Sequence, residues 1–287
     1  MGGRFGPESV AGLRRNNHFA RRLYMTPDQY VLSILNKYRV DTKNPTGLAF
    51  LLLPHQISPM QIKSELQPYI KDWAGEYLNS VLLSGSIAKG TAIKGTADLD
   101  LFISLKANTP ASLKEIYYFL NDHFTKAGFE TRTQNVSIGI NYKGKKIDLV
   151  PGKIQKGFLN YHSLYKSKKD SWIQTNIIKH ISLVKNSGRI NEIKAIKIWR
   201  ELNELDFSSI YLELSVIEAL RGKFRNQLAR NIITVFQYLS SQFVEKTITD
   251  PSNTNNILSN DLNKKDKQLI ANRAKEALNK NWEDVFY

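Results

Sequence analysis

The spacing of apolar residues changes about half-way along the chain. In the first half, some segments place apolar residues three or four positions apart, which predicts helices. Others place them two apart or in short runs, which predicts strands. One helix begins after Thr26, with Pro27 at its first position. Further helices are predicted at 58–78 and 109–126, and strands at 80–84, 99–105, 131–142 and 145–150. The last two strands form a hairpin.

From residue 171 onward the apolar period is helical almost throughout. Helices are predicted at 171–185, 189–204, 208–221, 224–244 and 261–280, and the polar run 250–256 (DPSNTNN) is predicted to be a loop. Together the two halves predict an α+β protein. Its N-terminal lobe holds a mixed, mostly antiparallel sheet with helices, and its C-terminal lobe is helical.

These patterns divide the chain into three segments. Residues 1–24 carry five arginines, one glutamate and no clear apolar period, so we expect a basic arm or an upstream extension without stable structure. Residues 25–165 form a first folded domain, and residues 166–287 form the helical domain.

Composition narrows the class of protein. Hydrophobic residues make up 41% of the 287 positions, which is enough for a sizeable core. No apolar run approaches the ~18 residues of a membrane span, and the longest, 48–53 (LAFLLL), is far shorter. The absence of cysteine excludes disulfides and thiolate zinc sites, and five scattered histidines argue against a zinc cage. We therefore expect a cytoplasmic protein.

The formal net charge is +15. A balance this basic favours polyanionic partners: nucleic acid, nucleotides or an anionic surface. The charge alone does not choose among them.

Asp98 and Asp100 carry the candidate chemistry. They flank Leu99 at the start of a predicted strand, so the period of two places both carboxylates on one face and Leu99 in the core. Two adjacent carboxylates repel each other unless a cation lies between them. Mg²⁺ prefers oxygen ligands and keeps positions for phosphate oxygens. Asp148 lies on a predicted strand with the same alternation and completes a two-metal site.

Gly85, Ser86, Gly90 and Thr91 precede these acids. They occupy a predicted junction between a strand and a helix, where backbone N–H groups hold phosphate and a missing side chain lets it approach. Lys89 borders the turn and is available to neutralise a triphosphate, although a solvated loop lysine is nearly as good an interpretation. The P-loop pattern G-x-x-x-x-G-K-[ST] is absent. A phosphate cradle beside clustered carboxylates predicts phosphoryl or nucleotidyl transfer.

The arrangement Gly85-Ser86, Gly90-Thr91, Asp98-x-Asp100 and Asp148 resembles the polymerase-β-type nucleotidyltransferase superfamily. The resemblance implies a bilobal fold with the three aspartates as ligands of two Mg²⁺ ions, for which Mn²⁺ can substitute. It also implies that Asp148 is the general base that activates the attacking hydroxyl.

Further motifs indicate a branch of this superfamily. Residues 147–151 (IDLVP) resemble the third-acid motif of archaeal CCA-adding enzymes, oligoadenylate synthetases and their cyclic-nucleotide-making relatives. In that group a helical lysine contacts the incoming triphosphate, which implies Lys197, with Lys194 as the rival. Ser209 and Tyr211 would lie by the nucleotide, unless Ser209 caps its helix and Tyr211 belongs to the core.

Asn160 offers both a donor and an acceptor to a base edge, and the alternative is a turn residue. His162 and His180 are interpreted as structural, because a metal mechanism needs no histidine.

Over residues 28–282 the chain resembles the bacterial cGAS/DncV-like nucleotidyltransferases (CD-NTases), and within them the CdnE-like branch. Members make cyclic di- or trinucleotide signals in antiphage (CBASS-type) defence. The resemblance therefore implies NTP substrates, a downstream effector protein that reads the signal, a monomer and no membrane association. Residues 25–165 would be the catalytic core, closed by an oligoadenylate-synthetase-like helical domain at 166–287.

Two other functions stay open. A template-independent terminal nucleotidyltransferase acting on RNA 3′ ends fits the basic charge. A non-catalytic nucleic-acid-binding protein fits less well, because a surface for polyanions gains nothing from clustered acids. The sequence has no Cys/His cluster that could form the zinc thumb of the animal DNA sensor, so activation by DNA of that kind is not expected. The basic charge still permits direct nucleic-acid binding without requiring it.

Overall fold

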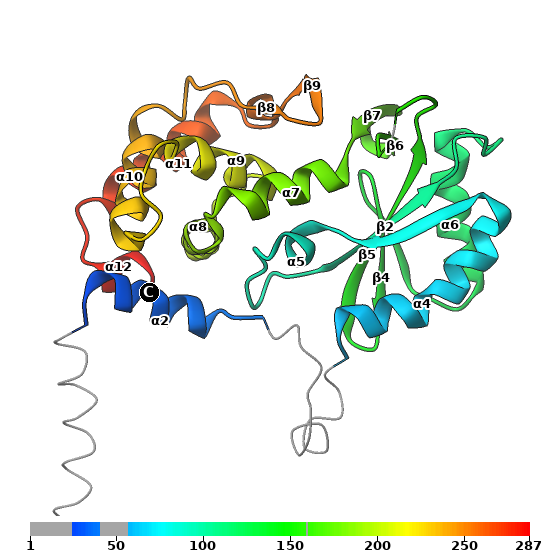
Figure 1. Cartoon of the computed structure of the whole chain (residues 1–287), viewed down its shortest axis with the longest axis horizontal. Helices are drawn as coiled ribbons and strands as arrows, with labels where there is room; N and C mark the ends of the chain where they lie inside the picture. The colour runs from blue at the N-terminus through cyan, green and yellow to red at the C-terminus, as the bar shows by residue number, and fades with distance from the viewer. Residues whose placement is uncertain (1–24, 41–56, 159) are drawn as a thin grey trace, which may run out of the picture.

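The computed structural model describes residues 25–40, 57–158 and 160–287. Figure 1 shows two parts, a sheet with helices α4 and α6 beside it and a group of helices linked to it through α7. Our predictions for residues 1–24 and for the apolar run 48–53 fall outside the described residues. None of the helices in the described ranges is both long and apolar enough to cross a membrane.

One seven-stranded sheet forms the first lobe. Its strands are β1 (Leu78–Leu83), β2 (Leu99–Leu105), β3 (Thr131–Thr133), β4 (Ile138–Tyr142), β5 (Lys145–Ile154), β6 (His162–Lys166) and β7 (Ser171–Thr175). The order is β1-β2-β5-β4-β3, with β6 paired to the far end of β5 and β7 paired to β6. Among the described strands of this sheet, β2 and β5 run parallel and the other neighbours are antiparallel. The predicted α+β class with a mixed, mostly antiparallel sheet is confirmed.

Helices α4 (Pro59–Ala74) and α6 (Leu113–Lys126) supply the apolar residues that cover one face of the sheet. The alternate residues Leu99, Leu101, Ile103 and Leu105 of β2 pack in this core. Because side chains alternate along a strand, the residues between them, Asp100 included, face the opposite side. The fold therefore leaves the acid-bearing face free of this core.

The start of α6 differs from the prediction. The helix does not begin at residue 109. Its N-cap is Ser112, whose hydroxyl accepts from the backbone N–H of Glu115, while the Glu115 carboxylate accepts from the N–H of Ser112. This reciprocal capping box satisfies two of the helix's otherwise unpaired donors.

The second lobe is helical. It contains α7 (Ile177–Ser187), α8 (Ile190–Leu202), α9 (Ser209–Ala219), α10 (Leu228–Ser241), α11 (Lys264–Ala277) and α12 (Trp282–Val285). Short 3₁₀ turns occur at Gly75–Tyr77, Ser167–Lys169 and Leu258–Asp261. The core is rich in aromatic rings: Trp199 meets Phe236 at 5.1 Å, and Tyr211 stacks on Phe243 at 5.0 Å, between ring centroids.

Helix α2 (Pro27–Lys37) lies beside this second lobe in Figure 1. Its buried residues Val31 and Ile34 belong to the same core as Trp199. The predicted first domain begins at residue 25, whereas the buried residues of α2 pack in the core of the helical lobe. The physical reason is that its apolar face finds partners in α8 and α10, far along the chain.

Two segments predicted as helix or loop contain strands. Residues 171–175, predicted to begin a helix, form β7, so the sheet continues past the expected boundary at residue 165. The predicted loop at 250–256 contains a hairpin of β8 (Thr249–Asp250) and β9 (Asn253–Ile257). Polar composition masked this hairpin, because its strands carry few apolar residues to set a period.

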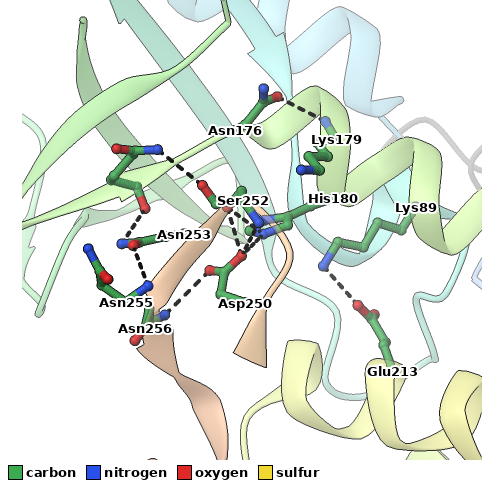
Figure 2. A network of polar contacts seen from close by, with 11 residues as sticks. Lys89, Asn176, Lys179, His180, Glu213, Asp250, Ser252, Asn253, Asn255 and Asn256 are labelled. Carbon is green, nitrogen blue, oxygen red and sulfur yellow. Dashed lines mark hydrogen bonds and ion pairs between the residues drawn. The ribbon is translucent and has the colours of Figure 1, made fainter. Parts of the chain in front are cut away.

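A polar network fastens this hairpin to α7 (Figure 2). His180 Nε2 lies 2.7 Å from Oδ1 of Asp250 and 2.9 Å from Oγ of Ser252, whose hydroxyl donates to the same carboxylate at 2.7 Å. A catalytic Ser–His–Asp triad needs its serine and its acid on different ring nitrogens. Here both lie on Nε2, so the cluster is structural.

Candidate active site

Asp100 and Asp148 are direct neighbours on the parallel strands β2 and β5. Asp100 shares its strand face with Phe102 and Ser104, away from the core under α4 and α6. Asp98 lies just before β2 and acts electrostatically on both other carboxylates. The three predicted acids thus come from two adjacent strands and interact with one another.

The acids repel one another as they stand. Burial, followed by the charge of Asp148, raises the pKa of Asp100 to about 6, even though Lys89 acts in the opposite sense. Burial also raises the pKa of Asp148, opposed by a hydrogen bond from Gln134. A divalent cation would reverse both effects by favouring the charged carboxylates.

The donor set is chemically suited to Mg²⁺, since it consists of carboxylate oxygens. Within residues 25–40, 57–158 and 160–287, however, no three His, Cys, Asp or Glu side chains are drawn together closely enough to form a metal cage. The residues fit the metal by the chemistry of their donor atoms.

Gly85 begins the short helix α5 (Gly85–Lys89) directly against Asp100. A Cβ atom at position 85 would collide with Oδ2 of Asp100, and the residue has φ +60°, a conformation that L side chains rarely adopt. Ser84 ties the same junction to β2, because its backbone N–H donates to the carbonyl of Asp100 at 2.9 Å. The start of α5 is therefore fixed beside the acids, with Ser86 as its second residue.

Gln134 supports Asp148 from the segment between β3 and β4. Its amide Nε2 donates to Oδ1 of Asp148 at 2.7 Å. A donor to the ionised form favours that form. Sequence reasoning missed Gln134, since nothing local to residue 134 marks it as a partner of residue 148.

Beyond α5, four buried residues form one polar cluster: Lys89, Thr91, Lys197 and Glu213. Figure 2 shows Lys89 donating to Oε2 of Glu213, at 2.8 Å. Lys197 donates to Oε1 of Glu213 at 2.9 Å and to the hydroxyl of Thr91 at 3.1 Å. The Thr91 hydroxyl in turn donates to Oε1 of Glu213 at 2.8 Å. The cluster joins the end of α5 to α8 and α9.

This cluster changes three predictions. Thr91 is fully buried, so it contacts Glu213 where we expected a phosphate. Lys89 and Lys197 are 8% and 2% exposed, so neither is a solvated lysine and neither is open to a ligand in this conformation. Lys194, the rival of Lys197, is half-buried, and burial lowers its pKa.

Tyr211 is corrected outright. Its side chain is 0% exposed and stacked on Phe243, so it belongs to the core and presents no ring to a base. Ser209 is the first residue of α9, whose N-cap is Ser208, so Ser209 is not the cap. Its hydroxyl lies 3.4 Å from Nη1 of Arg200.

Asn160 lies at a cavity of about 580 Å³ on the acid-bearing side of the sheet, which Phe102, Ser104 and His162 also line. Its φ of +65° identifies it as a turn residue as well. His162 is 6% exposed and lies 2.7 Å from the Ser104 hydroxyl. The cavity is further along β2 than Asp100, on the same face.

The segment that holds these residues is similar to known proteins. Residues 61–174, which contain the three acids and Gly85-Ser86, match the family model described as "Nucleotidyltransferase domain". This part of the chain is a nucleotidyltransferase domain. Over 214 residues the chain is 23% identical to the cyclic AMP-AMP-AMP synthase of Escherichia coli (strain MS 115-1), covering 67% of this chain and 66% of that protein.

Solved structures share the fold of this nucleotidyltransferase. E. coli MS115-1 CdnC with ATP matches at TM-score 0.69 and 20% identity over 88% of this chain and 90% of that one. The CD-NTase CdnG of Bradyrhizobium diazoefficiens with GTP matches at 0.71 and 10% identity, over 89% and 91%. The fold is that of the CD-NTases, as predicted.

Two other matches bear on the finer predictions. A CdnE c-di-GMP synthase from Capnocytophaga granulosa matches at TM-score 0.60 and 14% identity, over 89% of this chain and 98% of that one. The CdnE-like branch is therefore supported only in part, since CdnC and CdnG have higher scores. The Cid1 poly(U) polymerase bound to MgATP matches at 0.62 and 12% identity, over 90% and 97%.

Proposed function

We propose that this nucleotidyltransferase condenses nucleoside triphosphates into a cyclic di- or trinucleotide and releases pyrophosphate. The observation that carries the proposal is the position of Asp100 beside Asp148, with Asp98 interacting with both and Gly85 in contact with Asp100. The similarity to a protein named cyclic AMP-AMP-AMP synthase supports the class of product.

Asp98, Asp100 and Asp148 would hold two Mg²⁺ ions, with Mn²⁺ as a substitute. Bound metal supplies neutralising charge to the carboxylates and to the phosphate oxygens of the substrate. The protein's own groups orient the substrate and accept its proton. The backbone N–H groups at Gly85-Ser86 orient the triphosphate, and Asp148 accepts the proton of the attacking hydroxyl.

The transfer is a substitution at phosphorus, in which one bond to phosphorus forms and another breaks. The hydroxyl oxygen of one nucleotide bonds to the α-phosphorus of the next, the bond from that phosphorus to its bridging oxygen breaks, and pyrophosphate leaves. Asp148 takes the hydroxyl proton. A second transfer of the same kind within the linear product closes the ring.

The biological setting is part of the same proposal. A cyclic nucleotide made by a cytoplasmic, monomeric enzyme would act through an effector protein in antiphage (CBASS-type) signalling. The E. coli relative has been solved as a CdnC:HORMA-deltaN complex. We therefore propose that this enzyme, too, forms a complex with a protein partner.

A product assay tests the function. The protein is incubated with Mg²⁺ and the four labelled NTPs without nucleic acid, and the phosphatase-treated products are resolved by chromatography and mass. We expect a phosphatase-resistant compound with the mass of two or three condensed nucleotides. It should be lost in Asp98→Ala and kept in Asp122→Ala, which removes an exposed aspartate of α6.

A second candidate is terminal nucleotide addition to RNA. The Cid1 match and the net charge of +15 favour it. This function predicts that NTPs alone give no product. It also predicts that labelled RNA forms once tRNA or another primer is present. That result would overturn the cyclic-nucleotide proposal.

A further inference from the structure

Glu213 is the centre of the buried cluster that joins the two lobes. Its two carboxylate oxygens have different partners. Oε2 accepts from Lys89, and Oε1 accepts from both Lys197 and Thr91. These partners come from α5, from the residue after Gly90 and from α8, while Glu213 itself lies on α9. One side chain thus fixes three separate segments.

The cluster carries a net charge of +1, two ammonium groups against one carboxylate. Burial alone would raise the pKa of Glu213, but the two lysines outweigh it and keep the pKa below its usual value. Buried ion pairs are weak contributors to stability, since apolar residues of similar volume often do as well. A role in stability alone is therefore a poor explanation of this cluster.

The cluster acts on the candidate active site. Lys89 and Lys197 both lower the pKa of Asp100, against burial and the neighbouring aspartates. Lys89 is the last residue of α5, whose first residue is packed against Asp100. The position of α5 relative to the acids is thus set at one end by Gly85 and at the other by Glu213.

We propose that Glu213 is a positioning residue for nucleotide binding, which holds α5 and Lys197 in register with the catalytic acids through Lys89 and Thr91. It does not touch the reacting atoms. This role deepens the proposed function. It rests on one part of that proposal, the binding of a nucleoside triphosphate at this site.

Glu213→Gln separates three possible roles. The substitution keeps the shape and raises the cluster charge from +1 to +2. If the cluster served only as a positive field, nucleotide affinity would increase. If it served only the fold, the melting temperature would fall with the affinity unchanged. A positioning role predicts that affinity decreases although the site has become more positive.

The test is equilibrium binding to the full chain. Calorimetric titration with Mg²⁺ and the unreactive α,β-methylene analogues of the four NTPs first identifies an analogue that binds the wild type. We expect Glu213→Gln to weaken the Kd for that analogue by about tenfold or more. An unchanged or tighter Kd in the folded variant overturns the proposal.

Glu192→Gln is the matched control. Glu192 is also a buried acid, 3% exposed, and it accepts from Arg189 at 3.2 Å and from Asn231 at 2.8 Å, away from the aspartates. It should lower the melting temperature and leave the Kd unchanged. An equal loss of affinity in Glu192→Gln would show a general effect of a loosened helical lobe and overturn the positioning role.

If Glu213→Gln does not fold, Lys89→Arg tests the positioning role of Glu213 instead. It keeps the charge and changes only the geometry of the contact with Glu213, so we expect a weaker Kd, by about threefold or more. An unchanged Kd overturns the proposal. Binding of no analogue by the wild type would overturn the proposed function together with this inference, whereas normal binding in the variants would overturn this inference alone.

Discussion

Oδ2 of Asp100 lies in the space that a Cβ atom on residue 85 would need. The two residues belong to neighbouring antiparallel segments, since β1 pairs with β2 through Leu83 and Leu101 and only Ser84 separates Gly85 from β1. Strand pairing therefore brings the start of α5 against the acid. Glycine is required there for a second reason, its φ of +60°.

Gly85→Ala should abolish most of the activity. The new methyl group must displace the Asp100 carboxylate, and a displacement of about 1 Å at a catalytic group costs about 100-fold in rate. The positive φ adds a destabilisation of about 1–2 kcal/mol. Product formation from NTPs and thermal unfolding measure the two effects separately.

Gly144→Ala is the control for that substitution. Gly144 has φ +72° in the turn between β4 and β5, and an added Cβ would meet no atom within 4 Å. It should lose about 1 kcal/mol of stability and keep full activity. If Gly85→Ala behaves in the same way as Gly144→Ala, the contact with Asp100 has no catalytic importance.

Asp100→Asn should stabilise the metal-free protein at neutral pH while eliminating turnover. Because the folded pKa of about 6 exceeds the ordinary aspartate value of 3.8, the folded state holds this proton more tightly than the unfolded state. The stability from this group is therefore fully present below pH 3.8 and is lost as pH rises through about 6. Asparagine never ionises, so the gain at neutral pH is at most about 3 kcal/mol.

Thermal unfolding in EDTA across this pH range measures the effect. The difference in melting temperature between Asp100→Asn and the wild type should grow as pH rises through about 6. Asp122→Asn makes the same substitution at an exposed position and is the matched control. Added Mg²⁺ should narrow the Asp100→Asn difference, and a difference independent of both pH and Mg²⁺ would contradict the placement of Asp100.

The parts of the fold that sequence predicted well are those governed by local periodicity. The strand at 99–105 has the predicted bounds, since every second residue from Leu99 to Leu105 is apolar. The same alternation placed Asp100 on the face away from the core, and the hairpin before Asp148 followed from Lys143-Gly144. Local rules were sufficient for these elements.

The contacts that sequence did not predict join distant residues. Glu213 meets Lys89 across 124 positions and Thr91 across 122, so no window of sequence contains both partners. One signal was present: a single acid within the apolar run YLELSV (211–216) of α9. A charge at a buried helical position requires a partner, and that requirement points to a buried ion pair.

Gln134→Ala should make activity more sensitive to acid. The amide of Gln134 donates to Asp148 and opposes the effect of burial, so its removal raises the pKa of Asp148 further. The acid limb of the pH–activity profile should move to higher pH, and the apparent affinity for Mg²⁺ should fall by about tenfold. Initial rates across pH and Mg²⁺ concentration measure both shifts.

The neighbouring Asn135 supplies the control for Gln134. Its side-chain oxygen accepts from the backbone N–H of Lys168 at 3.4 Å, whereas the donor to Asp148 is Gln134, so Asn135→Ala perturbs the same segment and keeps the carboxylate contact. Its profile should match that of the wild type. A shared shift in both variants would assign the effect to the segment's conformation instead of to the hydrogen bond.

Tyr211→Phe should stabilise the protein and leave nucleotide binding unchanged. Among the described residues, the buried hydroxyl of Tyr211 has no hydrogen-bond partner, and burial raises its pKa. An unpaired buried hydroxyl costs about 1–3 kcal/mol, so its removal should raise the melting temperature while the stack on Phe243 remains. Nucleotide titration provides the second readout. A weaker Kd in Tyr211→Phe would show that the hydroxyl reaches the nucleotide after all, which would require α9 to rearrange on binding.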